Sequence, residues 1–184
     1  MSVNNPWKTC SSTVVYRNDW IAVREDKVIR PDGKEGIYGV VETPIATGVL
    51  ALTPEMHIYL VGQYRYPTEQ YSWEIVEGGS RKGELPLEAA KRELEEEAGL
   101  RASEWIPLGG EIHLSNCISA ERAHLFIARG LEEVARNPDP TEILTVQKVP
   151  FNRAYEMVRS GEIKDSMSVI GILLTNALIA EKQL

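Results

Sequence analysis

The sequence predicts an α/β protein of the α+β type with an N-terminal antiparallel β-unit. Three observations support this fold class. Short runs of β-branched and aromatic residues alternate with turn residues from the N-terminus to residue 78. Residues 85–98 then show the apolar period of a helix. The same period returns near the C-terminus, at 151–160 and 166–178.

The composition suits one compact domain with a small appendage, since the chain has 184 residues and 43% of them are hydrophobic. A net charge of −7, without a cluster of Lys and Arg, argues against a nucleic-acid partner. Cys10 and Cys117 match no zinc spacing or disulfide framework. No apolar run approaches the roughly 18 residues of a membrane span, and the N-terminus has no secretory pattern. We therefore expect a cytoplasmic protein with no membrane partner.

Residues 13–43 are expected to form the N-terminal β-unit. Its strands, joined by turns of which the strongest is 30–34, are predicted at 14–16, 20–29 and 37–41. Three strands bury too little surface to be stable alone, so they must pack on the main body or on another copy of the chain. This predicts an N-terminal β-unit at 1–45, followed by a main domain at 46–184.

The main domain opens with apolar runs at 48–53 and 57–63. They bracket Pro54-Glu55, which predicts a hairpin. An extended segment at 72–78 then leads to the helix at 85–98, and the later strands are predicted at 105–114, 123–128 and 143–149. For the two C-terminal helices, core packing is the interpretation that we adopt.

The helix at 85–98 concentrates carboxylates on one side. Glu84 and Pro86 suit its first turn, and Gly99 suits its end. Its buried stripe is expected to consist of Leu87, Ala90, Leu94 and Ala98. At 100° per residue, three further side chains share a face beside that stripe: Glu93, Glu96 and Glu97.

Carboxylates at this spacing repel one another, and partial burial strengthens the repulsion. Arg92 is expected to point to another sector of the helix, and Lys91 to be solvated. One divalent cation would then be the simplest way to neutralise these carboxylates, and several carboxylate oxygens suit Mg²⁺ or Mn²⁺. The alternative is a solvated acidic helix, which is the usual meaning of a run of charges.

The complete pattern decides between these interpretations. Gly78, Glu84 and the run from Arg92 to Leu100 resemble the Nudix box at its defining positions. The resemblance implies the Nudix fold, in which a mixed β-sheet is sandwiched between helices. It also implies a metal-dependent hydrolase that acts on a nucleoside diphosphate linked to another moiety.

The resemblance also implies roles for individual residues. Glu93 and Glu97 are expected to hold the metal, with Glu96 as ligand or base and the backbone carbonyl of Glu77 as a further ligand. Three residues are expected to support these ligands from behind: Gly78, Glu84 and Arg92.

The segment before the box points to one branch of the family. Gln63-Tyr64-Arg65, followed by the run from Trp73 to Gly78, resembles the lead-in of ADP-ribose pyrophosphatases. The resemblance implies that Arg65 clamps the diphosphate and that Glu74 is a site carboxylate. From the residues alone, Arg65 could instead be a surface residue at a strand end, and Glu74 an outward-facing strand residue.

Later segments carry further candidates. The branch has a proline where this chain has Ser115, a departure that widens the choice of substrate to other sugar nucleotides such as GDP-mannose. Glu121 lies near a loop glutamate of the branch and is expected to contact substrate. In the polar loop 136–142, Glu142 is the best match for the residue that activates water, with Asp139 second, and a solvated loop acid is the alternative.

Two aromatic residues of the N-terminal unit complete the predicted site. In dimeric relatives of the branch, N-terminal strands cross to the partner subunit and aromatic rings stack on the nucleobase. Trp20 and Tyr38 lie at similar places, and core packing is the alternative for each.

The sequence therefore predicts a homodimeric hydrolase that cleaves a nucleoside diphosphate sugar to a nucleoside monophosphate and a sugar phosphate. Two other functions stay open: hydrolysis of nucleoside triphosphates, and binding of a nucleotide by a Nudix-fold regulator without catalysis.

Overall fold

The computed structural model describes residues 4–139 and 141–184, so Pro140 of the predicted catalytic loop lies outside the described residues. The chain divides into two compact units. The first, called the N-terminal unit, contains Met1–Pro44 and His113–Arg122. The second, called the main unit, contains Ile45–Ile112 and Ala123–Leu184.

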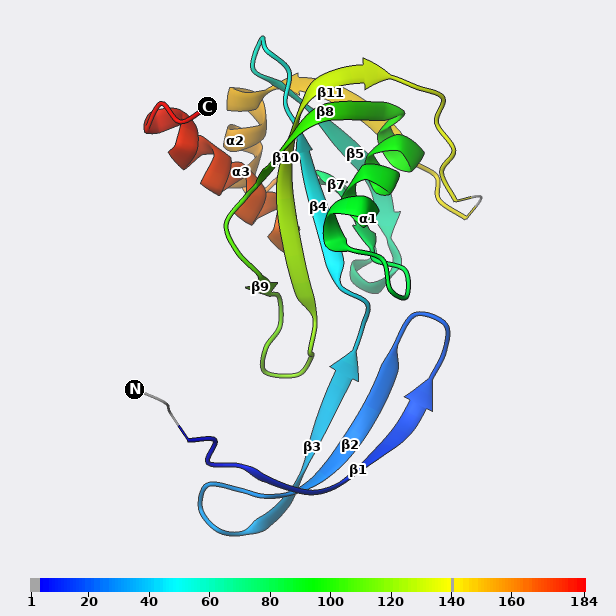
Figure 1. The fold of residues 1–184 in the computed structure, drawn as a ribbon, viewed down its shortest axis with the longest axis vertical. Coiled ribbons are helices and arrows are strands. Elements are labelled where there is room, and N and C mark those ends of the chain that lie inside the picture. The colour runs from blue at the N-terminus through cyan, green and yellow to red at the C-terminus, as the bar shows by residue number, and fades with distance from the viewer. Residues whose placement is uncertain (1–3, 140) are drawn as a thin grey trace. The chain divides into compact units, whose positions relative to one another are not determined.

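The N-terminal unit is built on an antiparallel meander of β1 (Lys8–Arg17), β2 (Ala22–Ile29) and β3 (Glu35–Glu42), drawn in blue in Figure 1. Asn18 forms the first turn, because its Oδ1 accepts hydrogen bonds from the N–H groups of Trp20 and Ile21. The segment 113–122 joins the unit on β3, where Val41 donates to the carbonyl of Ile118 at 2.9 Å. All residues of β1 are exposed, which makes β1 an uncovered edge strand.

The main unit holds two sheets. The first has the order β7-β4-β10-β8, formed by β7 (Val76–Gly79), β4 (Ala46–Ala51), β10 (Arg122–Glu133) and β8 (Leu100–Pro107). β4 and β10 run parallel while the other pairs are antiparallel, so the sheet is mixed, as predicted. The second sheet has the order β11-β5-β6, formed by β11 (Thr145–Pro150), β5 (His57–Arg65) and β6 (Gln70–Glu74). A two-residue strand, β9 (Ile112–His113), follows β8.

The predicted hairpin between 48–53 and 57–63 is wrong beyond its turn. The turn forms, since Met56 donates to Thr53 and Thr53 donates to His57. The two strands then enter different sheets, β4 between β7 and β10, and β5 between β11 and β6. The reason is burial: β4 is covered on both faces, as is typical of a strand with a parallel neighbour, and does not behave as one arm of an isolated hairpin.

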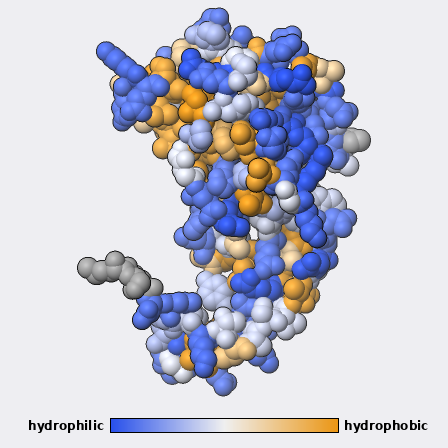
Figure 2. All heavy atoms as spheres, viewed as in Figure 1, coloured by the Kyte–Doolittle hydropathy of each residue, from blue (hydrophilic) through white to orange (hydrophobic). Residues whose placement is uncertain are grey.

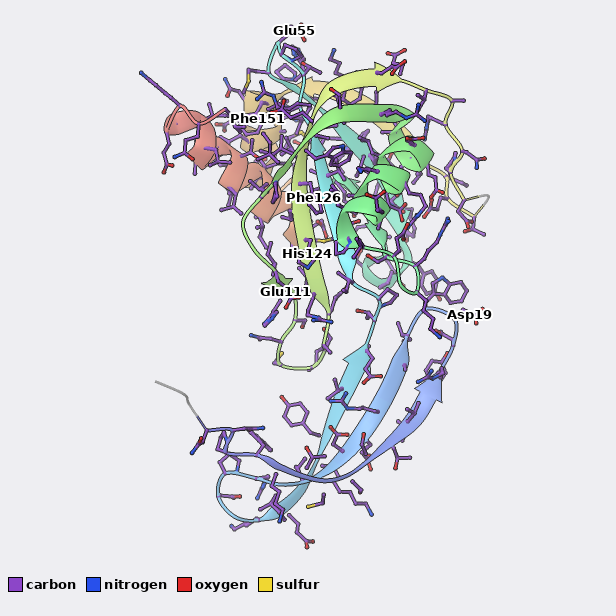
Figure 3. All side chains as sticks on the ribbon, in the orientation of Figure 1. Asp19, Glu55, Glu111, His124, Phe126 and Phe151 are labelled. Carbon is purple, nitrogen blue, oxygen red and sulfur yellow. The ribbon has the colours of Figure 1, made fainter. Side chains whose placement is uncertain are left out.

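Helices cover the first sheet. α1 (Pro86–Glu93) and α3 (Ser166–Ala180) both pack on β4, and α2 (Phe151–Arg159) packs on α3 and β11. Phe126 on β10 and Phe151 at the start of α2 are buried in this unit (Figure 3). A 3₁₀ turn (Tyr66–Thr68) follows β5. The mixed sheet between helices confirms the predicted fold class.

The helix that carries the carboxylates continues beyond α1. Its last turn is a π turn, Leu94–Ala98, which ends at Gly99 in the left-handed conformation with φ +66°. β8 starts directly afterwards, at Leu100, so the strand predicted at 105–114 is placed too late in the sequence. Apolar residues gather over α3 (Figure 2), where Leu173 and Leu174 are exposed. No helix in the described part of the chain is long and apolar enough to cross a membrane.

Candidate active site

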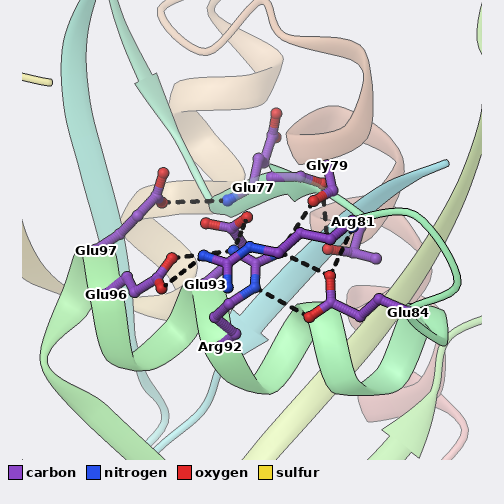
Figure 4. A network of polar contacts seen from close by, with 10 residues as sticks. Glu77, Gly79, Arg81, Glu84, Arg92, Glu93, Glu96 and Glu97 are labelled. Carbon is purple, nitrogen blue, oxygen red and sulfur yellow. Dashed lines mark hydrogen bonds and ion pairs between the residues drawn. The ribbon is translucent and has the colours of Figure 1, made fainter. Parts of the chain in front are cut away.

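The carboxylates of the helix lie together against β7. Glu97 is only 3% exposed, Glu93 is largely buried, and Glu96 is partly exposed. The backbone N–H of Glu77 donates to Glu97 Oε2 at 3.3 Å, which joins the π turn to the strand (Figure 4). The structure thus brings Glu77, Glu93 and Glu97 to one place, with Glu96 beside them.

Arg92 lies among these carboxylates, so the prediction that it points to another sector is wrong. Its guanidinium donates to Glu93 Oε1 at 2.6 Å and to Glu96 Oε2 at 3.0 Å. It also donates to both carboxylate oxygens of Glu84, at 3.0 and 2.9 Å, and to the carbonyl of Gly79. The physical reason is the length of the side chain, because the direction of a Cβ atom does not fix where a guanidinium ends. Figure 4 shows the network.

Gly78 makes room for this arrangement. A Cβ built on Gly78 would overlap the carboxyl group of Glu93, so no larger residue fits while Glu93 keeps its place. The glycine allows the helix carboxylate to approach the strand backbone closely. Gly78 would therefore act on the predicted metal ligand Glu93 by leaving space for its side chain.

The electrostatics of the site are strongly unbalanced. Burial, with the nearby charges of Glu93 and Glu142, raises the pKa of Glu97 to about 8. Burial also raises the pKa of Glu93, although the Arg92 guanidinium opposes this shift. The same guanidinium lowers the pKa of Glu84 to about 2. Negative charge on Glu97 is therefore poorly compensated, whereas Glu84 is fully paired.

Arg65 and Glu74 form a second element of the site. Glu74 is 2% exposed, which excludes the outward-facing alternative. Arg65 Nε lies 3.0 Å from both Glu74 oxygens, and Nη2 donates to Oε2. The pair borders a pocket of about 410 Å³. The other lining residues come from 67–72 and from the α2–α3 connection: Pro67, Thr68, Gln70, Tyr71, Ser72, Glu162, Lys164 and Asp165.

The loop before β11 brings Glu142 within electrostatic reach of the helix. Partial desolvation and the Asp139 carboxylate raise the pKa of Glu142, and the charge of Glu96 adds to this shift. Asp139 is already engaged, since its Oδ1 accepts from the backbone N–H and the hydroxyl of Thr141 at 2.8 and 2.6 Å. Of the two loop acids, Glu142 therefore has the stronger link to the cluster, because its charge acts on Glu93 and Glu97.

The remaining predicted contacts belong to the N-terminal unit. Trp20 is 74% exposed, so the core-packing alternative does not hold for it. Tyr38 donates its hydroxyl to the carbonyl of Cys117 at 2.8 Å and meets the edge of Trp7 at 5.4 Å between ring centroids. Glu121 is partly exposed, and its N–H donates to Ser119 Oγ. These residues and the carboxylate cluster lie in different units.

Two residues behind the site are not predicted from the sequence. Ser168 donates to the Glu77 carboxyl at 2.9 Å, and Asp165 caps α3 by accepting from the Ser168 N–H. Burial and the hydrogen-bonded Asp165 carboxyl raise the pKa of Glu77 well above its usual range. The sequence carries a signal for the cap only, because an Asp directly before an apolar run is typical of a helix N-terminus.

The donor set fits a hard divalent cation. Among the described residues, no three acidic, His or Cys side chains are close enough to enclose an ion without moving. The available donors are nevertheless carboxylate oxygens, as Mg²⁺ and Mn²⁺ require. The raised pKa of Glu97 marks a place where a positive charge would be stabilised. Arg92 supplies part of that charge at present.

Comparisons with known proteins agree with this geometry. Residues 42–166 match the family model described as NUDIX domain, and residues 7–41 match the model described as nucleoside diphosphate sugar hydrolase N-terminal domain. The chain is 33% identical to an ADP-ribose pyrophosphatase of Bacillus subtilis (strain 168), covering 95% of this chain and 97% of the relative. It is 32% identical to a methanol dehydrogenase activator of Bacillus methanolicus, covering 90% of each.

A third relative and a solved structure extend the comparison. An ADP-ribose pyrophosphatase of Mycobacterium tuberculosis is 33% identical, over 94% of this chain and 84% of the relative. A crystal structure of an ADP compounds hydrolase superposes with a TM-score of 0.83 over 100% of both chains, at 19% identity, which supports the fold. From the family match and the extent of these alignments, the chain belongs to the Nudix hydrolase family, in the branch of ADP-ribose pyrophosphatases and nucleoside diphosphate sugar hydrolases.

Proposed function

We propose that this Nudix hydrolase cleaves a nucleoside diphosphate sugar, such as ADP-ribose or GDP-mannose, to a nucleoside monophosphate and a sugar phosphate. One observation carries the proposal: a buried, poorly compensated carboxylate cluster lies within electrostatic reach of Arg65, which also borders an open pocket. The cluster suits a cation, the guanidinium suits phosphate oxygens, and the pocket offers room for the attached moiety.

The proposed reaction adds water to one phosphorus atom and breaks the bridging P–O bond. Glu93, Glu96, Glu97 and the carbonyl of Glu77 would hold Mg²⁺ or Mn²⁺. A bound ion would neutralise diphosphate charge and make water more acidic. Arg65 would hold the diphosphate in place, with its own orientation fixed by Glu74.

Protein groups also handle the proton and the ligand geometry. Glu142 would accept the proton of the attacking water, with Glu96 as the second candidate. The raised pKa of Glu142 makes its carboxylate a stronger base than that of an ordinary exposed glutamate. Arg92 would orient Glu93 and Glu96 while Glu84 balances its charge.

A substrate screen tests the proposed reaction. ADP-ribose, GDP-mannose, UDP-glucose and nucleoside triphosphates are each incubated with the protein and Mg²⁺, and phosphate is measured after addition of a phosphatase. Release from the diphosphate sugars is expected. Preferential cleavage of triphosphates would identify a triphosphate pyrophosphohydrolase instead, and nucleotide binding without cleavage would identify a regulator.

Glu142→Gln is expected to lower kcat by about 10²-fold and to leave KM nearly unchanged, because the variant keeps its shape but cannot accept a proton. Steady-state kinetics on the best substrate of the screen measures both constants. Asp139→Asn tests the other loop acid, whose carboxylate accepts two hydrogen bonds from Thr141 and is expected to affect kcat less, through its charge beside Glu142. A larger loss of kcat in Glu96→Gln than in Glu142→Gln, with unchanged Mn²⁺ binding, would transfer the role of base to Glu96.

We further propose that the N-terminal unit forms a homodimer and that Trp20 stacks on the nucleobase. The ten residues of β1 are exposed, and they include the apolar side chains of Val14, Val15 and Tyr16. An edge strand of this kind is a template for pairing with a second chain. Light scattering is expected to give twice the mass of one chain, and a monomeric mass would contradict the dimer.

A further inference from the structure

The segment 74–79 carries the backbone side of the candidate active site. Glu74 pairs with Arg65, and the N–H of Glu77 donates to Glu97. Gly78 faces the carboxyl of Glu93, and the carbonyl of Gly79 accepts from Arg92. A small displacement of this segment would therefore disturb Arg65, Arg92 and the helix carboxylates Glu93 and Glu97 at once.

The chain crosses between the two sheets of the main unit at Ile75. Glu74 is the last residue of β6 and pairs with β5. Val76 is the first residue of β7 and pairs with β4. Ile75 belongs to neither ladder, so its buried N–H needs a partner from elsewhere. The sheets alone do not fix the backbone at this crossing.

Ser168 supplies that partner. It is fully buried in the first turn of α3, and its Oγ accepts the hydrogen bond of the Ile75 N–H at 2.9 Å. The same hydroxyl donates to Glu77 Oε1 at 2.9 Å. The Ser168 N–H donates to Asp165 Oδ2 at 2.8 Å. This cap fixes the backbone of Ser168 and so limits where its hydroxyl can lie. One side chain thus fixes the strand on both sides of Val76.

We propose that Ser168 is a positioning residue for the active site, which sets the place of the Glu77 carbonyl and of Gly78 opposite the helix carboxylates. The inference rests on the proposed function, because the backbone that the hydroxyl positions would hold the metal ion and face the substrate. Ser168 is fully buried and does not line the pocket beside Arg65. It acts through the segment 74–79, in the way that groups behind metal ligands orient them.

Thr175 provides a matched control on the same helix. It is fully buried, and its Oγ1 has no hydrogen-bond partner among the described residues. Thr175→Val removes a buried hydroxyl at nearly constant volume and breaks no hydrogen bond to the segment 74–79. Any effect that comes from altering a buried hydroxyl of α3 in general should appear in this variant too.

The experiment measures Mn²⁺ binding by electron paramagnetic resonance, kcat and KM on a nucleoside diphosphate sugar with Mg²⁺, and thermal unfolding of each variant. In Ser168→Ala, the Kd for Mn²⁺ is expected to rise and kcat to fall, each by about tenfold or more. KM should change little, and Thr175→Val should match the wild type in Mn²⁺ binding and kcat. Ser168→Cys, whose thiol is a weaker donor, should fall between Ser168→Ala and the wild type.

If Ser168→Ala keeps the Mn²⁺ affinity and the kcat of the wild type, the inference is overturned, even if the variant unfolds at a lower temperature. If Ser168→Ala does not fold, Ser168→Cys decides by the same two quantities. A wild-type protein that binds Mn²⁺ but cleaves no diphosphate sugar would contradict the proposed function. The role of Ser168 would still be tested, by comparing the Kd for Mn²⁺ of Ser168→Ala with that of the wild type.

Discussion

Glu97→Gln is expected to lower kcat by about 10³-fold, which corresponds to ~4 kcal/mol of lost transition-state stabilisation. The carboxylate of Glu97 is the most deeply buried of the helix cluster, and it faces the backbone of Glu77. A neutral amide cannot balance a divalent cation there, so both metal binding and charge stabilisation are lost. Kinetics at saturating Mg²⁺, with Mn²⁺ binding as a second readout, measures the effect.

The fold of this variant is expected to survive. At neutral pH the metal-free protein holds Glu97 mostly protonated, because its pKa is about 8. Gln replaces a neutral acid of the same shape, and its carbonyl oxygen can still accept from the Glu77 N–H. Glu95→Gln is the control from the same helix, since Glu95 lies at the surface and pairs with Arg101. Near-normal activity in Glu97→Gln would remove the metal assignment.

The pH dependence of stability gives an independent check on Glu97. Its carboxyl has an ordinary pKa of 4.5 and a folded-state pKa of about 8, so the native state holds the extra proton between these values. The metal-free wild type should therefore lose stability as pH rises through this range, and Glu97→Gln should lose less. Urea unfolding in the presence of a chelator, at about pH 5 and about pH 8, compares the two slopes.

The sequence could predict the carboxylate cluster because the period of a helix is local. Pro86 and Gly99 mark the ends of the helical segment, and 100° per residue then places Glu93, Glu96 and Glu97 on one side. The position of the Arg92 guanidinium could not be derived in this way. It depends on Glu84 and Gly79, which lie in a loop and a strand that the helix period does not describe.

Pairing between distant segments was beyond sequence reasoning for the same reason. The runs at 48–53 and 57–63 look like the arms of a hairpin, because turn residues separate them. Their real partners, β10 and β11, come much later in the chain. The bond from the Ile75 N–H to Ser168 likewise joins residues 93 positions apart. No local pattern reports such contacts.

Arg65→Gln is expected to lower kcat/KM by about 10²-fold, because the planar guanidinium can hold two phosphate oxygens at once and an amide cannot. The same change leaves the buried carboxylate of Glu74 without its cation, which should cost about 3 kcal/mol of stability. Kinetics at a temperature where the variant is folded, together with urea unfolding, separates the two effects.

The double variant Arg65→Gln with Glu74→Gln shows which effect limits activity. It removes both charges, so the buried carboxylate no longer lacks a partner and most of the lost stability should return. The low kcat/KM should remain, because the phosphate clamp is still missing. Glu74→Gln alone keeps the guanidinium, so it should lose less activity than Arg65→Gln or the double variant. Recovery of kcat/KM in the double variant would instead mean that Arg65 serves the fold, and the diphosphate would need another cation.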